Sequence, residues 1–191
     1  MAAQENQTAV VVPVLSADSL LAQWLNRSGM PSHVTIVYPF LDRDAINDSV
    51  VEALTGIFAQ VPVIELELTR CDRFPGVLYL VPEPVEVFRQ LALSVTAAWP
   101  EAPPYRGAFP GVTPHMTVTR SRRPEALDDV EHEVLSRLPF TATLDVGWLM
   151  HFDGSKWQFD VELPFAAQGQ MTGTKPPTVG GNPPVMREPA T

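Results

Sequence analysis

A chain of 191 residues with 45% hydrophobic and 18% charged side chains is long enough for one full core, or for two small lobes that share one. Its formal net charge of -9 argues against a protein that coats long nucleic acid, because contacts to phosphate supply most of the affinity for such polymers. A small molecule or a chain end that carries a phosphate is compatible with this charge.

The start of the chain and its cysteine content indicate the compartment. The opening sequence MAAQENQTAV contains a glutamate and no basic residue, which is untypical of a secretory signal peptide. No apolar stretch approaches the roughly 20 residues that span a bilayer. Cys71 is the single cysteine of the sequence, so an internal disulfide and a metal site built from several cysteines are ruled out. We therefore expect a monomer in the cytoplasm that binds no membrane.

The first part of the chain alternates strand and helix patterns. An apolar run at residues 9–15 predicts a strand, and a segment with leucines and a tryptophan at helical spacing follows it. The segment HVTIVYPF, which begins at His33, is rich in β-branched and aromatic residues and predicts a second strand. An apolar stripe over Ile46–Phe58 predicts a helix, for which Asp42 or Asp44 can provide the N-cap.

The middle and end of the chain predict two hairpins with helices around them. Val63–Thr69 and the segment VLYLV flank a Phe-Pro-Gly turn, which predicts the first hairpin. A helix pattern starts at Pro84, and a loop rich in proline and glycine follows it. The segment VTPHMTVTR, which contains His115, predicts another strand, and a helix pattern begins near Pro124. The strands of the second predicted hairpin are Phe140–Trp148 and Trp157–Leu163.

These elements predict one domain and a tail. We expect the domain to occupy residues 1–163. Residues 164–191 are rich in Gln, Gly, Thr and Pro, and we expect them to be a disordered tail. Each half of the domain holds one histidine strand followed by a helix and a hairpin. This near-repeat predicts an α+β fold with two pseudo-symmetric lobes of antiparallel sheet, helices on the outside, and a central cleft between the lobes.

Both histidine strands carry the pattern His-x-Thr-apolar. Because successive side chains of a strand point to opposite faces, His33 shares a face with Thr35, and His115 shares one with Thr117. An imidazole titrates at about pH 6.5, so one histidine can accept a proton while the other donates one, and either can take either role. Threonine hydroxyls can donate hydrogen bonds to phosphoryl oxygens. These groups predict hydrolysis or transesterification of a phosphodiester, with no metal and no other cofactor.

The segments HVTI at His33 and HMTV at His115 resemble the paired motifs of the 2H phosphoesterase superfamily, which includes the 2'-5' RNA ligase-like RNA cyclic phosphodiesterases. The resemblance spans about Ala9 to Leu163. It implies a bilobal α+β fold with a central cleft. It also implies metal-independent cleavage of cyclic phosphodiesters, with 2',3'-cyclic phosphate ends of RNA or small cyclic or 2'-5' nucleotides as substrates.

The resemblance further implies roles for individual residues. By matching position, the acid/base pair is His33 and His115, and the phosphate-binding hydroxyls belong to Thr35 and Thr117. Arg120 stands five residues after His115, where relatives often place an arginine that contacts phosphate. Strict alternation puts Arg120 on the opposite face from His115, so it reaches the cleft only if the strand ends or bends. Tyr38 is the matching residue of the first half and a candidate for binding substrate, by stacking on a base, or for packing.

Two other functions fit the same residues. A nucleotide- or phosphate-binding module would keep the cleft without turnover, and the acidic surface and proline-rich end of the chain favour it. A 2'-5' RNA ligase would run the same chemistry backward, although the sequence shows no loop for a nucleoside triphosphate. No metal motif accompanies His151. Phe74, Tyr79 and Phe109 are candidates for an aromatic platform under a nucleobase, with packing as the simpler explanation of each.

Overall fold

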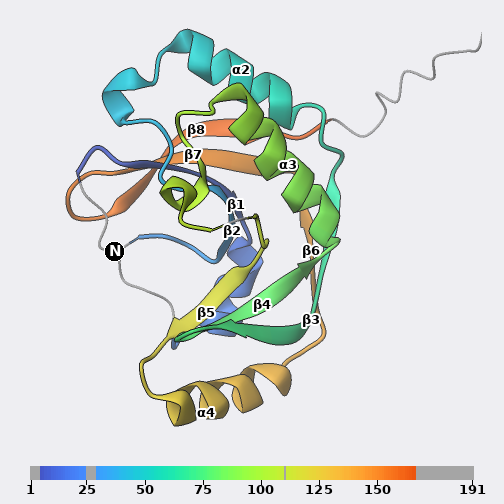
Figure 1. The fold of residues 1–191 in the computed structure, drawn as a ribbon. Helices are drawn as coiled ribbons and strands as arrows, with labels where there is room; N and C mark the ends of the chain where they lie inside the picture. Colours follow the sequence, from blue (N-terminus) through green and yellow to red (C-terminus); the bar gives the residue numbers. More distant parts are fainter. Residues whose placement is uncertain (1–4, 25–28, 110, 167–191) are drawn as a thin grey trace, which may run out of the picture.

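The computed structural model describes residues 5–24, 29–109 and 111–166 (Figure 1). Its strands form two antiparallel sheets of four, with the orders β2-β1-β7-β8 and β5-β4-β3-β6. The first sheet consists of β1 (Thr8–Pro13), β2 (His33–Val37), β7 (Val146–Phe152) and β8 (Trp157–Pro164). The second consists of β3 (Ile64–Phe74), β4 (Val77–Glu83), β5 (Met116–Arg120) and β6 (Phe140–Leu144).

Helices lie outside both sheets. They are α1 (Asp18–Leu21), α2 (Asp48–Phe58), α3 (Val85–Ala98) and α4 (Pro124–Leu135). α2 lies against β8, α3 lies against β2 and α2, and α4 covers the second sheet from below in Figure 1. The arrangement confirms the predicted α+β fold of two antiparallel sheets with outer helices. None of the helices in the described part of the chain has both the length and the apolar character needed to cross a membrane.

A short turn separates β2 from α2 and changes the expected helix start. The 3-10 turn η2 (Arg43–Ala45) comes first, and Asn47 then caps α2 by accepting a hydrogen bond of 3.1 Å from the backbone N–H of Val50. The expectation that Asp42 or Asp44 caps this helix is therefore wrong. Both residues lie before or within η2, too early to reach the first free N–H groups of α2.

Each sheet combines strands from both halves of the chain. The hairpin β3–β4 follows β2 in sequence, but β4 pairs with β5. The hairpin β7–β8 follows β5, but β7 pairs with β1, which lies beside β2. The prediction of a single strand over Phe140–Trp148 is wrong, because this segment contains parts of two strands, which are separated at Asp145. β6 pairs with β3 in the second sheet, whereas β7 pairs with β1 in the first. The near-repeat of the sequence therefore does not divide the chain into two contiguous lobes.

Apolar residues cover both faces of the first sheet. All six residues of β1 are buried, as is typical of a central strand with both faces covered. Val10 and Val12 belong to the main core, which extends through the second sheet to Leu66 and Leu80. The alternate residues of β1, Ala9 and Val11, belong to a smaller cluster on the opposite face, together with the buried side chains of Met150 and Trp157. The smaller cluster lies on the face of the first sheet that also carries Thr35, since Thr35 pairs with Val11.

The described chain stays packed slightly past the predicted end of the domain. Phe165 is buried, and its N–H donates to the carbonyl of Asp145 at 2.8 Å. The N–H of Ala166 donates to the carbonyl of Val61 at 2.8 Å. The remainder of the predicted tail, residues 167–191, lies outside the described residues.

Two glycines give opposite predictions for stability. A methyl group added at Gly147 of β7 would overlap the buried ring of Phe58, whereas one added at Gly56 of α2 would meet nothing within 4 Å. We expect Gly147→Ala to lower the free energy of unfolding by about 1–3 kcal/mol through overpacking. We expect Gly56→Ala to raise it by roughly 1 kcal/mol, because alanine favours a helix over glycine. Urea unfolding of both variants checks this, and equal effects of the two substitutions would contradict the packing described.

Candidate active site

The two histidines lie on facing edge strands. β2 is at the edge of the first sheet and β5 is at the edge of the second, and the two strands contact each other. His33 begins β2, and His115 directly precedes β5. The burial pattern confirms the predicted alternation, because the residues that intervene in each motif are in the main core. These residues are Val34, Ile36, Met116 and Val118, with exposed fractions of 0%, 2%, 0% and 3%.

Both imidazoles are fixed in the same way. Nδ1 of His33 lies 2.7 Å from the carbonyl oxygen of Pro31, and Nδ1 of His115 lies 2.8 Å from the carbonyl oxygen of Thr113. A carbonyl oxygen can only accept a hydrogen bond, so each Nδ1 carries the proton and donates. Nε2 is therefore the nitrogen of each ring that is left to exchange a proton with a ligand.

A shift of register brings Arg120 to the same face as His115. Tyr79 of β4 pairs with Thr117, but the preceding residue of β4, Leu78, pairs with Thr119, so β5 contains one extra residue at this point. Such a bulge reverses the alternation beyond it. Arg120 pairs with Val77 and therefore shares the face of Thr117. The strand irregularity that the sequence analysis named as the condition for Arg120 to share this face is therefore present.

A bulge of the same kind occurs in β2. Val11 of β1 pairs with Thr35, but Val10 pairs with Val37, so β2 also contains one extra residue after its threonine. Tyr38 consequently packs against the small apolar cluster on the face of Thr35. Its hydroxyl donates to Oε1 of Gln7 at 2.9 Å, and its ring meets Trp157 edge to face at a centroid distance of 5.8 Å.

Burial and charge act together on the histidines. Burial lowers the pKa of His33 below its ordinary value of 6.5, and the charges of His115 and Arg120 lower it further, against a raising effect of the hydrogen bond to Pro31 and of Asp18. Burial also lowers the pKa of His115, and Arg120 adds to this shift. Arg120 therefore acts electrostatically on both imidazoles, which places its charge near the two of them.

Tyr105 is a site residue that the sequence analysis did not find. It lies in the turn η3 (Pro104–Gly107), within the loop rich in proline and glycine. Burial raises the pKa of Tyr105, while a hydrogen bond with the hydroxyl of Thr35 and the charge of Arg120 oppose the shift. Its ring stacks on that of His115 at a centroid distance of 6.5 Å, and its backbone N–H donates to the carbonyl of Tyr38 at 2.7 Å. Tyr105 thus contacts both histidine motifs.

Aromatic rings surround His115. Phe74 meets the imidazole edge to face at 5.1 Å between centroids, and Tyr79 meets it at 5.4 Å. Phe74 and Tyr79 also stack on each other at 4.4 Å, so these two candidates for a nucleobase platform pack on the histidine instead. Phe109, the third candidate, is 64% exposed and touches the ring of Tyr105 edge to face.

The other residues considered from the sequence lie apart from this group. His151 of β7 places Nδ1 3.2 Å from a carboxylate oxygen of Asp160, which also pairs with Arg43. Burial raises the pKa of the Cys71 thiol to about 11, so it is a poor nucleophile near neutral pH. Among the described side chains, no group of three or more His, Cys, Asp and Glu residues is arranged to hold a metal ion.

Comparison with known families assigns the chain. Residues 19–156, most of the described domain, match the model of the 2'-5' RNA ligase superfamily. The chain belongs to the 2'-5' RNA ligase superfamily. This membership confirms the resemblance to the 2H phosphoesterases that the paired histidine motifs indicated. No protein with a curated description matches the chain significantly.

Several solved structures share the fold. The structure of E. coli LigT complexed with 3'-AMP has a TM-score of 0.56 at 13% identity, covering 86% of this chain and 100% of that one. A structure described as a phosphoesterase has a TM-score of 0.53 at 14% identity, with the same coverage of both chains. A protein of Thermus thermophilus has a TM-score of 0.51 at 15% identity, covering 83% of this chain and 97% of that one.

The positive charge of Arg120 should have a measurable effect on the pKa values of the two histidines. Removing its positive charge in Arg120→Gln should raise the pKa of both His33 and His115, because a nearby cation disfavours the protonated imidazole. A pH titration of the imidazole resonances by NMR measures both values. Arg122→Gln, at an exposed residue nearby, is the control and should leave them unchanged. Unchanged values in Arg120→Gln would contradict the placement of Arg120 beside the histidines.

Proposed function

We propose that this chain is a 2H-type phosphodiesterase that opens 2',3'-cyclic phosphate ends of RNA, or small cyclic or 2'-5' nucleotides, by acid/base catalysis with His33 and His115. One observation carries the proposal. Two imidazoles on facing edge strands are held by equivalent Nδ1 hydrogen bonds, and each has a threonine on its own face. This arrangement presents two Nε2 atoms, one from each sheet, to a ligand that lies between the strands.

The proposed reaction transfers two protons. The Nε2 of the neutral histidine takes a proton from a water molecule, whose oxygen attacks phosphorus. One of the two ester bonds of the cyclic phosphate breaks, and its ribose oxygen takes a proton from Nε2 of the other, protonated histidine. The products are a ribose hydroxyl and a phosphate monoester. After the reaction the first histidine is protonated and the second is neutral. Proton exchange with solvent restores the initial protonation states before the next turnover.

The environments of the two histidines resemble each other. Burial lowers the pKa of both imidazoles, and the charge of Arg120 adds to the lowering of each. Each ring also keeps its Nδ1 proton on a backbone carbonyl. Either histidine can therefore act as the base that activates water, while the other acts as the acid that protonates the leaving oxygen.

Hydroxyl groups and one arginine provide the phosphate contacts of the proposal. The hydroxyl of Thr117 faces the same side of β5 as His115. Thr35 and Tyr105 share a hydrogen bond, in which one hydroxyl donates and the other accepts. The accepting hydroxyl keeps its own proton and can donate it in a hydrogen bond to a phosphoryl oxygen. Arg120 balances the negative charge that increases on the phosphoryl group in the transition state. A nucleotide ligand is supported by the superfamily fold, since the similar E. coli LigT was crystallised with 3'-AMP.

Substitution of either histidine tests the proposed function. We expect His33→Ala and His115→Ala each to lower kcat for a nucleoside 2',3'-cyclic phosphate by roughly 100- to 10,000-fold, because each removes a proton-transfer group. His132→Ala, at an exposed residue of α4, is the control. The assay is run with and without EDTA, and the wild-type rate should be the same in both. Near-wild-type activity of either active-site variant would contradict the acid/base assignment, and inhibition by EDTA would contradict the metal-independent reaction.

Two further measurements separate the alternatives. Calorimetric binding of a nucleotide by the wild type without product formation over hours would identify a binding module. Formation of 2'-5' linkages from cyclic-phosphate and hydroxyl ends in excess over cleavage would identify a ligase.

The role of Tyr105 can be measured with a double-mutant cycle. Tyr105→Phe keeps the ring against His115 but removes the hydroxyl that bonds Thr35. We expect it to lower kcat/KM about 2- to 10-fold, the effect of one hydrogen bond of about 0.5–1.5 kcal/mol. In a Thr35→Val background the same substitution should have little further effect. Fully additive losses would show that the two hydroxyls act independently.

A further inference from the structure

One peptide group links the imidazole of His33 to a carboxylate. The carbonyl oxygen of Pro31 accepts the hydrogen bond of His33 Nδ1 at 2.7 Å. The N–H of the same peptide group, which belongs to Ser32, donates to Oδ1 of Asp18 at 2.7 Å. The C=O and N–H of a planar trans peptide point in opposite directions. The imidazole and the carboxylate therefore lie on opposite sides of this peptide and are joined by a chain of two hydrogen bonds.

The linking peptide is fixed and largely shielded from water. Ser32 is only 3% exposed, and its carbonyl accepts a hydrogen bond of 2.7 Å from the N–H of Val14. Asp18 is half-buried at the start of α1. Hydrogen bonds that form a chain polarise one another, and each is stronger where water is excluded. The negative charge of Asp18 can therefore strengthen the hydrogen bond that orients His33.

A proline prevents an equivalent chain at the second histidine. Nδ1 of His115 donates to the carbonyl of Thr113, but the next residue is Pro114, which has no N–H. The peptide between Thr113 and Pro114 therefore cannot donate to a carboxylate. The difference follows from the position of a proline, which stands two residues before His33 but directly before His115.

The charges that act on His33 differ in sign and in origin. Burial is the largest effect and lowers the pKa of His33, and the charges of His115 and Arg120, from the side of β5, lower it further. Asp18, from α1, acts in the opposite direction and raises this pKa, because an anion favours the protonated imidazole. His115 has the same two kinds of lowering effect, burial and Arg120. The anionic neighbour thus distinguishes the first histidine from the second.

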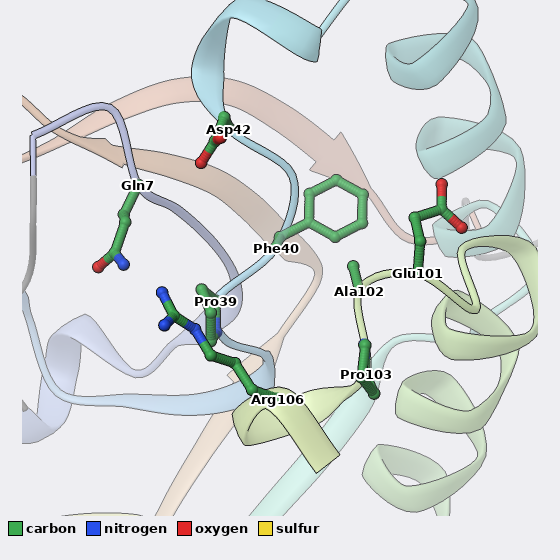
Figure 2. A pocket seen from close by; sticks show the side chains of 8 residues that line it. All are labelled: Gln7, Pro39, Phe40, Asp42, Glu101, Ala102, Pro103 and Arg106. Atoms are coloured by element: carbon green, nitrogen blue, oxygen red, sulfur yellow. The ribbon is translucent and has the colours of Figure 1, made fainter.

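Other carboxylates of this part of the fold do not take the place of Asp18. Asp42 and Glu101 line a hollow beside the turn η3 (Figure 2), and neither histidine is among the residues of its lining. In the described part of the chain, neither carboxylate is among the groups whose charge shifts the pKa of His33 or of His115. Asp42 therefore offers a matched control for Asp18.

We propose that Asp18 is a positioning residue of the candidate active site, which fixes the imidazole of His33 through the peptide of Ser32. It also gives His33, but not His115, a nearby negative charge. In catalytic triads a carboxylate that bonds a histidine directly orients the ring and stabilises its protonated form. Here one peptide group stands between the carboxylate and the ring.

The inference rests on the proposed function, because it assigns how one of the two proton-transfer groups is controlled. Both possible roles of His33 depend on this carboxylate. As a base, His33 takes a proton from water more readily beside an anion. As an acid, a larger fraction of His33 carries a proton near neutral pH.

The test separates the charge of Asp18 from its hydrogen bond. Asp18→Asn keeps an oxygen that can accept from the N–H of Ser32 but removes the charge, and Asp18→Ala removes both. A pH titration of the imidazole resonances by NMR needs no substrate and measures both histidines. We expect Asp18→Asn to lower the pKa of His33 and to change that of His115 less. Asp42→Asn should leave both values unchanged.

Activity towards a nucleoside 2',3'-cyclic phosphate is the second readout. We expect Asp18→Asn to lower kcat about 3- to 10-fold and Asp18→Ala to lower it about 10- to 100-fold, as is typical when a partner that orients a functional histidine is removed. In the pH profile of kcat/KM, Asp18→Asn should move one limb, that of His33, to lower pH and leave the other in place.

An unchanged pKa of His33 in Asp18→Asn would overturn the inference, and so would wild-type kcat in both Asp18 variants of an active enzyme. Failure of the proposed function looks different, since the wild type then opens no cyclic phosphate. In that case the NMR titration alone decides whether Asp18 controls His33. If Asp18→Ala does not fold, Asp18→Asn decides both readouts, because it retains the hydrogen bond to Ser32.

Discussion

Contact between two edge strands is the constraint on which the candidate site depends. β2 and β5 each end a different sheet, and only their contact brings His33 and His115 together. Each edge strand is held in its sheet by pairing from one side alone, through β1 and β4. The main core, which continues through both sheets, fixes the distance between them. The chemistry of the site is thus a consequence of how two sheets share one core.

Local backbone features then add two side chains to the facing surfaces of this frame. A strict strand would place one imidazole and one hydroxyl on each facing surface and nothing more. One extra residue in each of β2 and β5 adds Tyr38 and Arg120 to the same faces. Burial makes the protonated form of both imidazoles costly, and the guanidinium of Arg120 adds to that cost. In the proposed reaction, the negative charge of a phosphodiester would oppose this effect and favour protonation of one histidine.

The sequence predicted those parts of the site that depend on the period of a strand. His33, Thr35, His115 and Thr117 follow from alternation, and the burial of the intervening residues agrees with it. The register shifts that bring Arg120 and Tyr38 to these faces have no sequence signal as specific as a glycine turn. Tyr105 was missed because its position depends on a left-handed backbone within a loop. The split at Asp145 was missed because β6 and β7 together form one continuous strand pattern, although each pairs with a different sheet.

The exchange of hairpins between the two halves has a consequence for how the chain folds. β1 and β2 belong to the beginning of the chain, yet the two strands that complete their sheet are β7 and β8, which end at Pro164. As the chain leaves the ribosome, the strand with the first histidine is therefore made long before its sheet can close. Pairing between such distant segments slows folding, because the chain loses the entropy of closing a long loop before the new contacts stabilise it. The second sheet lacks β5 and β6 for a shorter time, so it can assemble first and provide the surface on which the first sheet is completed.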